Sequence, residues 1–353
     1  MLSHMNSAPS TPVLPSAPED DSDTPVNTPA IAVDDFTDVC RCDGARGVRC
    51  LISSRTPTVN SKMTCPISHP CRKVSSISNM KMVDVIAVPD LMPNDEEEQD
   101  RMDLTHHIWL MMLKGELYNA PIGESPQNIL DLGTGTGIWA MDIADAHVIG
   151  NDISPIQPSW VAPNIEFVVE DFESEWQYKR NHFDFIHARC LAGCVADWPQ
   201  FFRRIFSHVK PGGYFETHES AVWARSDDNS LKENSALMEW QQAVNFAGEK
   251  SGRELNVYHK LKNWMIEAGF EDVTLSVYAL PFSPWPRDPH LKALGKYQAV
   301  QLQQAIDSYS LRLYTQVLGW SSDVAKIHNA VVKQELRDKK LHAYVQTYSS
   351  YPP

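Results

Sequence analysis

The chain lacks both a long apolar run and an excess of positive charge. No segment of its 353 residues approaches the roughly 20 continuous apolar residues that cross a bilayer, and residues 1–30 contain no apolar core typical of a secretory signal. Lys and Arg total 31 against 45 Asp and Glu, and the net charge of −14 would repel a phosphate backbone. We therefore expect an intracellular protein, in the cytoplasm or the nucleus, with neither a membrane nor a nucleic acid as its partner.

Cysteine is also scarce, and its spacing argues against a metal site. The seven cysteines are an odd number, which fits a reducing compartment better than a disulfide framework. Five of them lie between residues 40 and 71. Structural zinc sites pair Cys-x2-4-Cys knuckles, whereas Cys40 and Cys42 are too close together and Cys50, Cys65 and Cys71 form no second knuckle. The sequence therefore predicts no bound metal.

The N-terminal quarter has the composition of a segment without a packed core. Residues 1–36 contain six prolines, many Ser and Thr, and an acidic cluster. Such a segment cannot bury enough apolar surface to offset its conformational entropy, so we predict disorder. Residues 37–88 continue without helical or strand periodicity and are predicted to be loop or weakly ordered. The predicted folded domain spans residues 89–353.

An amphipathic helix is predicted to lead into this domain. Asn94 followed three residues later by Glu97 matches a capping box. The acidic run 95–98 suits the positive end of a helix dipole, or simply forms a solvated first turn. Apolar residues then recur at one-face helical spacing up to about residue 117: Leu104, Ile108, Met111 and Met112.

From residue 128 onward, strand-like and helix-like segments alternate, which is typical of a parallel sheet with crossover helices. The expected strands are 128–132, 147–151, 165–169, 183–187, 214–218 and 273–280, and a last run at 342–348 could return as an edge strand. The expected helices are 138–146, 198–209, 231–250, 257–268, 290–318 and 322–339. The aromatic residues of the C-terminal helices form either a substrate lid or part of the core: Trp285, Tyr297, Tyr314 and Trp320.

A glycine-rich turn follows the first expected strand. Glycine is needed where the backbone takes a positive φ or where a ligand approaches it closely, and the next helix offers free amides to that ligand. The spacing Gly-x-Gly-x-Gly departs from the G-x-G-x-x-G fingerprint of dinucleotide-binding proteins. We predict that a cofactor binds this turn at the carboxyl edge of the sheet. The predicted binding residues of the turn are Gly133, Thr134, Gly135 and Gly137.

Asp131, at the strand end just before the glycines, decides between cofactors. A carboxylate in this position would repel a pyrophosphate but attract an ammonium group and a nearby sulfonium. It therefore favours S-adenosylmethionine over NAD. The alternative is that Asp131 is a polar strand-end cap whose oxygens serve the turn amides.

Two more carboxylates follow the next two expected strands. Asp152 lies where an acid can accept hydrogen bonds from both ribose hydroxyls, and Ile153 after it is included in the predicted site. Asp171 suits the adenine amino group, with Phe172 against the ring. Each acid taken alone could be a helix cap or a surface residue. Three acids at successive strand ends make a cofactor site the stronger interpretation.

These features form part of a longer motif series. With Phe183-Asp-Phe-Ile-His187 and Lys210-Pro-Gly-Gly-Tyr-Phe215, they resemble class I S-adenosylmethionine-dependent methyltransferases over roughly residues 128–219. A closer similarity, from about residue 93 to the C-terminus, is to the fungal LaeA-type methyltransferase family. It is carried by the segments 93–101, 106–107, 117–122, 152–158, 187–189 and 197–198.

The resemblance implies a fold and two possible roles. The fold is α/β, with a Rossmann-like seven-stranded sheet, mostly parallel with the last strand antiparallel, helices on both faces and an N-terminal helix that helps to close the cofactor site. One role is O-methylation of a small molecule in fungal secondary metabolism. The other is that of a LaeA-type regulator in a nuclear complex with a velvet-type protein partner. An NAD-dependent enzyme is a third interpretation, which the charge of Asp131 disfavours.

Candidate catalytic groups lie at the ends of the fourth and fifth expected strands. Methyl transfer is an in-line displacement in which proximity and alignment supply much of the rate, although a hydroxyl acceptor can need a base. His187 or His218 could take that proton, and Arg189 could orient an anionic acceptor. Glu219 is a further strand-end candidate. The alternative is that all four are hydrogen-bonded scaffold groups.

Overall fold

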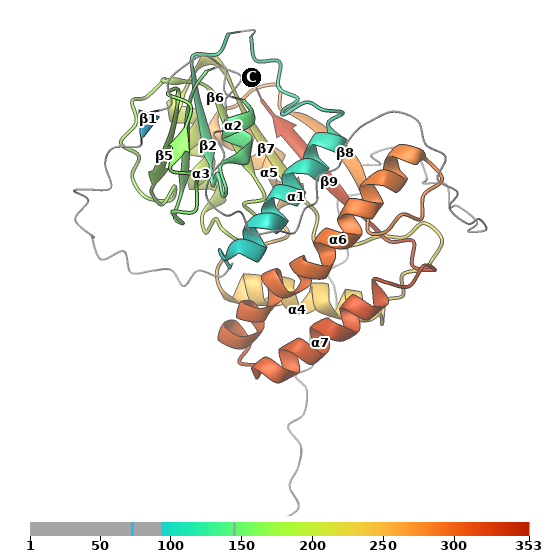
Figure 1. Ribbon diagram of the computed structural model, residues 1–353. Helices are drawn as coiled ribbons and strands as arrows, with labels where there is room; N and C mark the ends of the chain where they lie inside the picture. The colour runs from blue at the N-terminus through green and yellow to red at the C-terminus, as the bar shows by residue number, and fades with distance from the viewer. Residues whose placement is uncertain (1–71, 74–92, 124, 144–145, 353) are drawn as a thin grey trace, which may run out of the picture.

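The computed structural model describes residues 72–73, 93–123, 125–143 and 146–352 (Figure 1). Of the segment 1–88, it describes only β1 (Arg72–Lys73), which pairs antiparallel with β4 (Trp160–Val161). The rest of the predicted disordered segment lies outside the described residues, so the boundary at residue 89 stays a prediction. Within the described part, no helix is both long and apolar enough to cross a membrane.

A seven-stranded sheet forms the centre of the fold. Its strand order is β5-β3-β2-β6-β7-β9-β8, and β9 alone runs in the opposite direction to the other six strands. The mostly parallel sheet with an antiparallel last strand is therefore confirmed. The strands are β2 (Asn128–Leu132), β3 (His147–Asp152), β5 (Ile165–Val169), β6 (Phe183–Arg189), β7 (Val209–Ser220), β8 (Thr274–Pro281) and β9 (Tyr344–Tyr351).

The last strand is not at the edge, so that prediction was wrong. β9 lies between β7 and β8, where Thr347, Ser349 and Ser350 are completely buried. β8 is the edge strand instead, and its Leu275 is partly exposed. The polar residues of β9 pack inside the sheet because their side chains are small and strands pair on both sides.

Helices cover both faces of the sheet, as predicted. Because successive strand residues point to opposite faces, Ile186 packs with α3 and α5 while its neighbour Phe185 packs against Trp139 of α2. The helices are α1 (Glu96–Met112), α2 (Ile138–Asp142), α3 (Trp198–His208), α4 (Ala236–Lys250), α5 (Tyr258–Ala268), α6 (Pro289–Arg312), the π-helix η1 (Leu313–Val317) and α7 (Ser322–Glu335).

Several helix starts and ends differ from the prediction: α1 ends at Met112 rather than near residue 117, and α7 ends at Glu335 rather than at residue 339. The N-cap of α1 is Asp95, which accepts a hydrogen bond from the Glu98 amide, and not Asn94. α2 ends at Asp142, earlier than expected. α4 begins only at Ala236, because the Ser235 side chain caps it by accepting a hydrogen bond from the amide of Met238.

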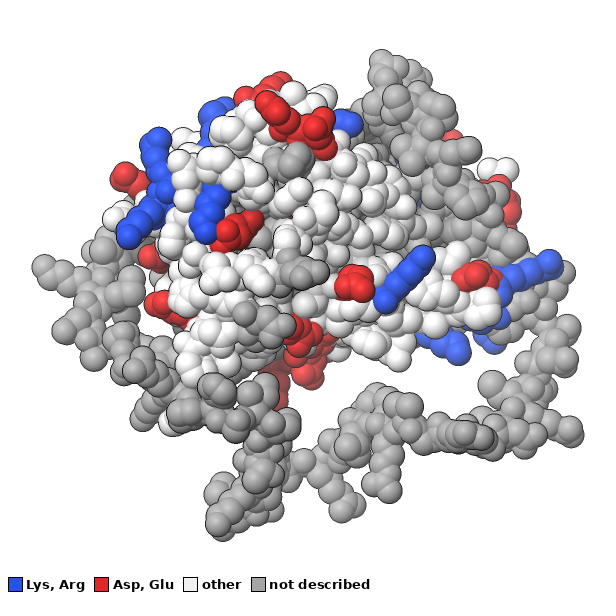
Figure 2. Space-filling model, turned by 90° about the horizontal axis from the view of Figure 1, so that it is seen from above, with Lys and Arg blue, Asp and Glu red and all other residues white. Residues whose placement is uncertain are grey.

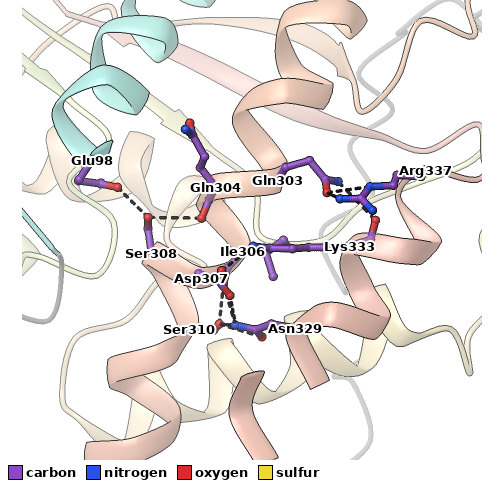
Figure 3. A network of polar contacts seen from close by, with 10 residues as sticks. All are labelled: Glu98, Gln303, Gln304, Ile306, Asp307, Ser308, Ser310, Asn329, Lys333 and Arg337. Atoms are coloured by element: carbon purple, nitrogen blue, oxygen red, sulfur yellow. Dashed lines mark hydrogen bonds and ion pairs between the residues drawn. The ribbon is translucent and has the colours of Figure 1, made fainter. Parts of the chain in front are cut away.

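A second group of helices, α1, α4, α6 and α7, packs together beside the sheet (Figure 1). Glu98 of α1 is buried rather than solvated, because it binds Arg101 and accepts a hydrogen bond from Ser308 of α6 at 2.7 Å. Figure 3 also shows Asp307, the neighbour of Ser308 on α6, which accepts hydrogen bonds from Asn329 and Lys333 of α7. The polar network therefore joins α1 to the C-terminal helices.

The aromatic residues of the C-terminal helices divide between core and surface. Trp285 and Tyr314 are buried in the core. Tyr297 is 40% exposed and packs against the ring of His107. On the face of the molecule shown in Figure 2, the visible Lys and Arg side chains are interspersed with Asp and Glu.

Replacement of Gly295 by Ala tests how closely α6 packs on the loop after β8. A Cβ atom at this position would lie 2.2 Å from the carbonyl oxygen of Ser283, so the backbone must move. We expect Gly295→Ala to lose about 1–3 kcal/mol of unfolding free energy, although alanine favours helices by about 1 kcal/mol. Urea unfolding measures this, with the exposed neighbour Lys296→Ala as control. Equal stability of Gly295→Ala and wild type would contradict the packing described.

Candidate cofactor and active site

The glycine turn between β2 and α2 has a backbone that only glycine adopts easily. Gly133 has a φ of 65° and Gly137 a φ of 81°. A Cβ at Gly133 would lie 2.6 Å from the side chain of Leu191, and one at Gly137 would lie 2.4 Å from the ring of Phe167. Conformation and crowding therefore both require glycine at these two positions.

Asp152, at the end of β3, holds this turn from one side. Its carboxylate accepts hydrogen bonds from the amides of Gly135 at 2.8 Å and Ser154 at 2.9 Å. The side chain of Gln157 then donates to the carbonyl oxygens of both residues, at 2.7 and 2.9 Å. Ile153 is 52% exposed beside them. The ends of β2 and β3 are thereby joined, as adjacent parallel strands allow.

Asp131 holds the turn from within. It is 3% exposed, and it accepts hydrogen bonds from the hydroxyl of Thr134 at 2.6 Å and from Nδ1 of His187 at 2.7 Å. Burial raises the pKa of the Asp131 carboxyl to about 6. Each oxygen has one hydrogen bond within the protein and a further lone pair, so the strand-end role and the ligand role do not exclude each other.

His187 is oriented by this carboxylate. Its ring stacks on Trp139 with centroids 3.7 Å apart, and the side chain is 1% exposed. Burial, followed by the nearby charges of His218 and Arg189, lowers the pKa of His187 well below its ordinary value. The neutral ring therefore donates from Nδ1 to Asp131, which leaves Nε2 as a buried acceptor without a partner among the described residues.

Comparisons with known proteins agree with this architecture. Residues 108–275 match a family model described as a methyltransferase domain. The chain is 39% identical over 256 residues to methyltransferase pytC of Aspergillus terreus, covering 71% of this chain and 79% of that relative. It is 36% identical to the secondary metabolism regulator LAE1 of Cochliobolus heterostrophus (72% of this chain, 86% of LAE1). It is 35% identical to the protein-methionine methyltransferase laeA of Emericella nidulans (72% and 69%).

The chain belongs to this methyltransferase family. The predicted resemblance to class I and LaeA-type methyltransferases is therefore confirmed. The same matches place the chain among relatives from fungal secondary metabolism.

The second predicted catalytic histidine of the methyltransferase, His218, is also held by an acid. It is completely buried, it stacks on Trp109, and its Nε2 lies 2.6 Å from Glu216. Although burial acts to raise it, the hydrogen bond from His218 holds the pKa of Glu216 below its ordinary value. Glu216 also accepts hydrogen bonds from the amides of Asn119 and Ala120. This burial favours the scaffold interpretation of both histidines, and a catalytic role for either stays a prediction.

Asp171 and Phe172 lie at the far side of the turn. The Asp171 carboxylate accepts a hydrogen bond from the amide of Glu173 at 2.8 Å. The ring of Phe172 is 8% exposed, packs against Phe201, and lies 3.7 Å from the position of a Cβ at Gly133. The structure thus brings Phe172 to the glycine turn but uses part of Asp171 to cap its own loop.

Helix α1 covers the glycine turn through residues that sequence reasoning missed. The sulfur of Met102 lies 3.2 Å from the position of a Cβ at Gly135. Asp103 accepts a hydrogen bond from Thr136 at 2.7 Å. The sequence pattern of α1 did not indicate these contacts of Met102 and Asp103. The contacts depend on how α1 packs against the sheet, which a local pattern does not reveal.

His106 fastens the same helix to the sheet. A guanidinium only donates hydrogen bonds, so Nδ1 of His106 accepts from Arg189 at 3.1 Å while Nε2 donates to Asp142 at 2.9 Å. Burial and the charge of Arg189 lower the pKa of His106. Among the residues that the structure describes, no three His, Cys, Asp or Glu side chains form a group that could hold a metal ion.

The titration of Asp131 gives a test of its environment. Because burial raises the pKa of Asp131 to about 6, the unfolded chain releases a proton between about pH 4 and pH 6 that the folded chain retains. The unfolding free energy due to this group therefore falls as the pH rises. The side chain of Asp131→Asn does not titrate. We therefore expect the unfolding free energy of this variant to rise relative to that of wild type by up to about 3 kcal/mol between about pH 4 and pH 7.

Urea unfolding across this pH range measures that difference. Asp184→Asn is the matched control, because Asp184 lies at the opposite end of β6 and its ion pair with Lys210 and two backbone amides lower its pKa against the effect of burial. Its difference from wild type should stay constant over the range. A constant difference for Asp131→Asn as well would contradict the assigned pKa.

Proposed function

We propose that this methyltransferase uses S-adenosylmethionine as its methyl donor and methylates a hydroxyl oxygen of a small molecule in fungal secondary metabolism. The observation that carries the proposal is the crowded glycine turn flanked by Asp131 and Asp152 at the ends of adjacent strands. The names of the relatives, a methyltransferase and secondary metabolism regulators, support it.

The residues of the turn fit this cofactor by charge. S-adenosylmethionine carries an ammonium group, a cationic sulfur and two ribose hydroxyls, and when bound it supplies an electrophilic methyl group. Asp131 would attract the cationic end, and Asp152 would accept hydrogen bonds from the ribose. A dinucleotide would bring its pyrophosphate against the same carboxylates. The remaining predicted cofactor contacts lie in the glycine turn and directly after β3 and β5: Gly133, Thr134, Gly135, Gly137, Ile153, Asp171 and Phe172.

The chain's own contribution to the reaction is chiefly positioning. Met102 and Asp103 of α1 lie against the turn and cover part of it. Arg189 lies beside His106 at the same edge, where it would orient an anionic acceptor. In the part of the chain that the structure describes, His187 and His218 each leave one nitrogen without a partner. We propose that proximity supplies most of the rate and that either histidine takes a proton only from an acceptor seated against it.

Calorimetry with S-adenosylmethionine, S-adenosylhomocysteine and NAD tests the cofactor. We expect both sulfur compounds to bind and NAD not to bind. Asp131→Asn and Asp152→Asn should each weaken S-adenosylhomocysteine binding by about tenfold, equivalent to about 1.4 kcal/mol. The control Asp184→Asn, at the other end of the sheet, should bind like wild type. Binding of NAD alone would overturn the proposal.

A regulatory role is the second candidate. The identities to the regulator LAE1 and to laeA, 36% and 35%, are close to the 39% identity to pytC. In this role the protein would act in the nucleus, with a velvet-type protein partner, whereas the small-molecule enzyme would act in the cytoplasm. No nucleic acid or membrane enters either proposal.

Transfer of a labelled methyl group separates the two roles. The protein would be incubated with methyl-labelled S-adenosylmethionine and a fungal extract divided into small-molecule and protein fractions. We expect label in the small-molecule fraction, with Asp152→Asn as the control for cofactor dependence. Label that enters protein alone would favour the second candidate.

A further inference from the structure

The chain makes an unusual turn directly after β6. Cys190 has a φ of 58°, which side chains other than glycine rarely adopt, and its amide donates to the carbonyl oxygen of His218 at 2.9 Å. The next two amides, of Leu191 and Ala192, donate to the carboxylate of Glu219 at 2.7 and 3.3 Å. Glu219 is 1% exposed at the end of β7. One buried carboxylate therefore fixes the path of this turn.

The turn continues directly to the glycine turn of β2. The side chain of Leu191 is buried and occupies the space where Gly133 would carry a Cβ, with its methyl carbon 2.6 Å from that position. A ring carbon of Phe172 lies 3.7 Å from the same Cβ position. Leu191 therefore connects Glu219 to Gly133: its backbone amide binds Glu219, and its side chain lies against Gly133.

We propose that Glu219 is a positioning residue for the cofactor: through two backbone amides it seats Leu191 against Gly133 and so holds the glycine turn in its binding conformation. The proposal rests on the proposed use of S-adenosylmethionine. Glu219 does not touch the cofactor in this scheme. It acts through the turn that it anchors.

Protonation of Glu219 would release this anchor. The ionised carboxylate accepts hydrogen bonds from both amides. In the protonated acid one oxygen carries a hydrogen, which competes with one of the two amide hydrogens for the same position. Burial raises the pKa of Glu219 to about 7. The titratable groups that face it are the thiols of Cys190 and Cys194 on the same loop, and Tyr348 is its register partner on β9. Cofactor affinity should therefore fall as the pH falls through about 7.

The variant Glu219→Gln mimics the protonated state at every pH, because the amide side chain offers one acceptor oxygen and one donor NH2 group. We expect its S-adenosylhomocysteine affinity at pH 8.5 to be about fivefold weaker than that of wild type. The ratio of the two dissociation constants should approach about one near pH 6. Asp131 titrates in both proteins, so the ratio cancels its contribution.

The matched control is Glu173→Gln. Glu173 accepts a hydrogen bond from the amide of Ala196 at 2.7 Å and forms an ion pair with Arg253 at 2.8 Å, and neither partner is among the residues nearest to Gly133. The S-adenosylhomocysteine dissociation constants of Glu173→Gln and wild type should have a ratio near one at every pH. Thermal unfolding at pH 8.5 supplies a second control. Because burial disfavours the charged Glu219, the neutral Gln should not lower the melting temperature, so weaker binding would not reflect unfolding.

Leu191→Ala tests the other end of the contact. It should weaken S-adenosylhomocysteine binding while Glu219 is intact, and adding Glu219→Gln to it should weaken binding little further. If wild type binds but its affinity ratio to Glu219→Gln is near one or independent of pH, the inference is wrong and the cofactor assignment stands. If wild type does not bind S-adenosylhomocysteine at all, the proposed function itself has failed.

Discussion

The position of the glycine turn after β2 is the constraint on which the rest of this site depends. The turn has positive φ angles and no room for side chains at Gly133 and Gly137, so it cannot adjust by itself. Every neighbouring element must approach its bare backbone. Leu191, Met102 of α1 and Phe167 each lie close to a different glycine of the turn, so segments distant in the sequence meet there.

Carboxylates, of which Glu216 and Glu219 are buried, organise the loops at this edge of the sheet. Asp152 binds the Gly135 amide, Glu216 binds the amides of Asn119 and Ala120, and Glu219 binds that of Leu191. A carboxylate can satisfy several backbone donors at once, which compensates for its desolvation. The acids of this negatively charged chain therefore fix its loops.

The sequence was informative wherever local pattern and local chemistry coincide. Alternating strands and helices predicted the parallel sheet, and the spacing of Gly133, Gly135 and Gly137 predicted the turn that joins β2 to α2. The place of β9 was missed, because strand order depends on pairing between distant segments. The burial of Glu98 was missed for a similar reason, since its partner Ser308 lies on α6. Local acidity alone cannot distinguish a solvated first turn from a buried one.

The two histidines show the limit of assigning chemistry from strand-end position. His187 and His218 do lie at the ends of adjacent strands, but each is buried, stacked on a tryptophan and bound to a carboxylate. A carboxylate that orients one nitrogen prepares the other to accept a proton, yet the same contacts serve equally to join two strands to α1 and α2. The geometry therefore assigns each histidine a structural role. Its chemistry depends on whether an acceptor reaches the remaining nitrogen, and access to that nitrogen is controlled by the helices that pack over the sheet.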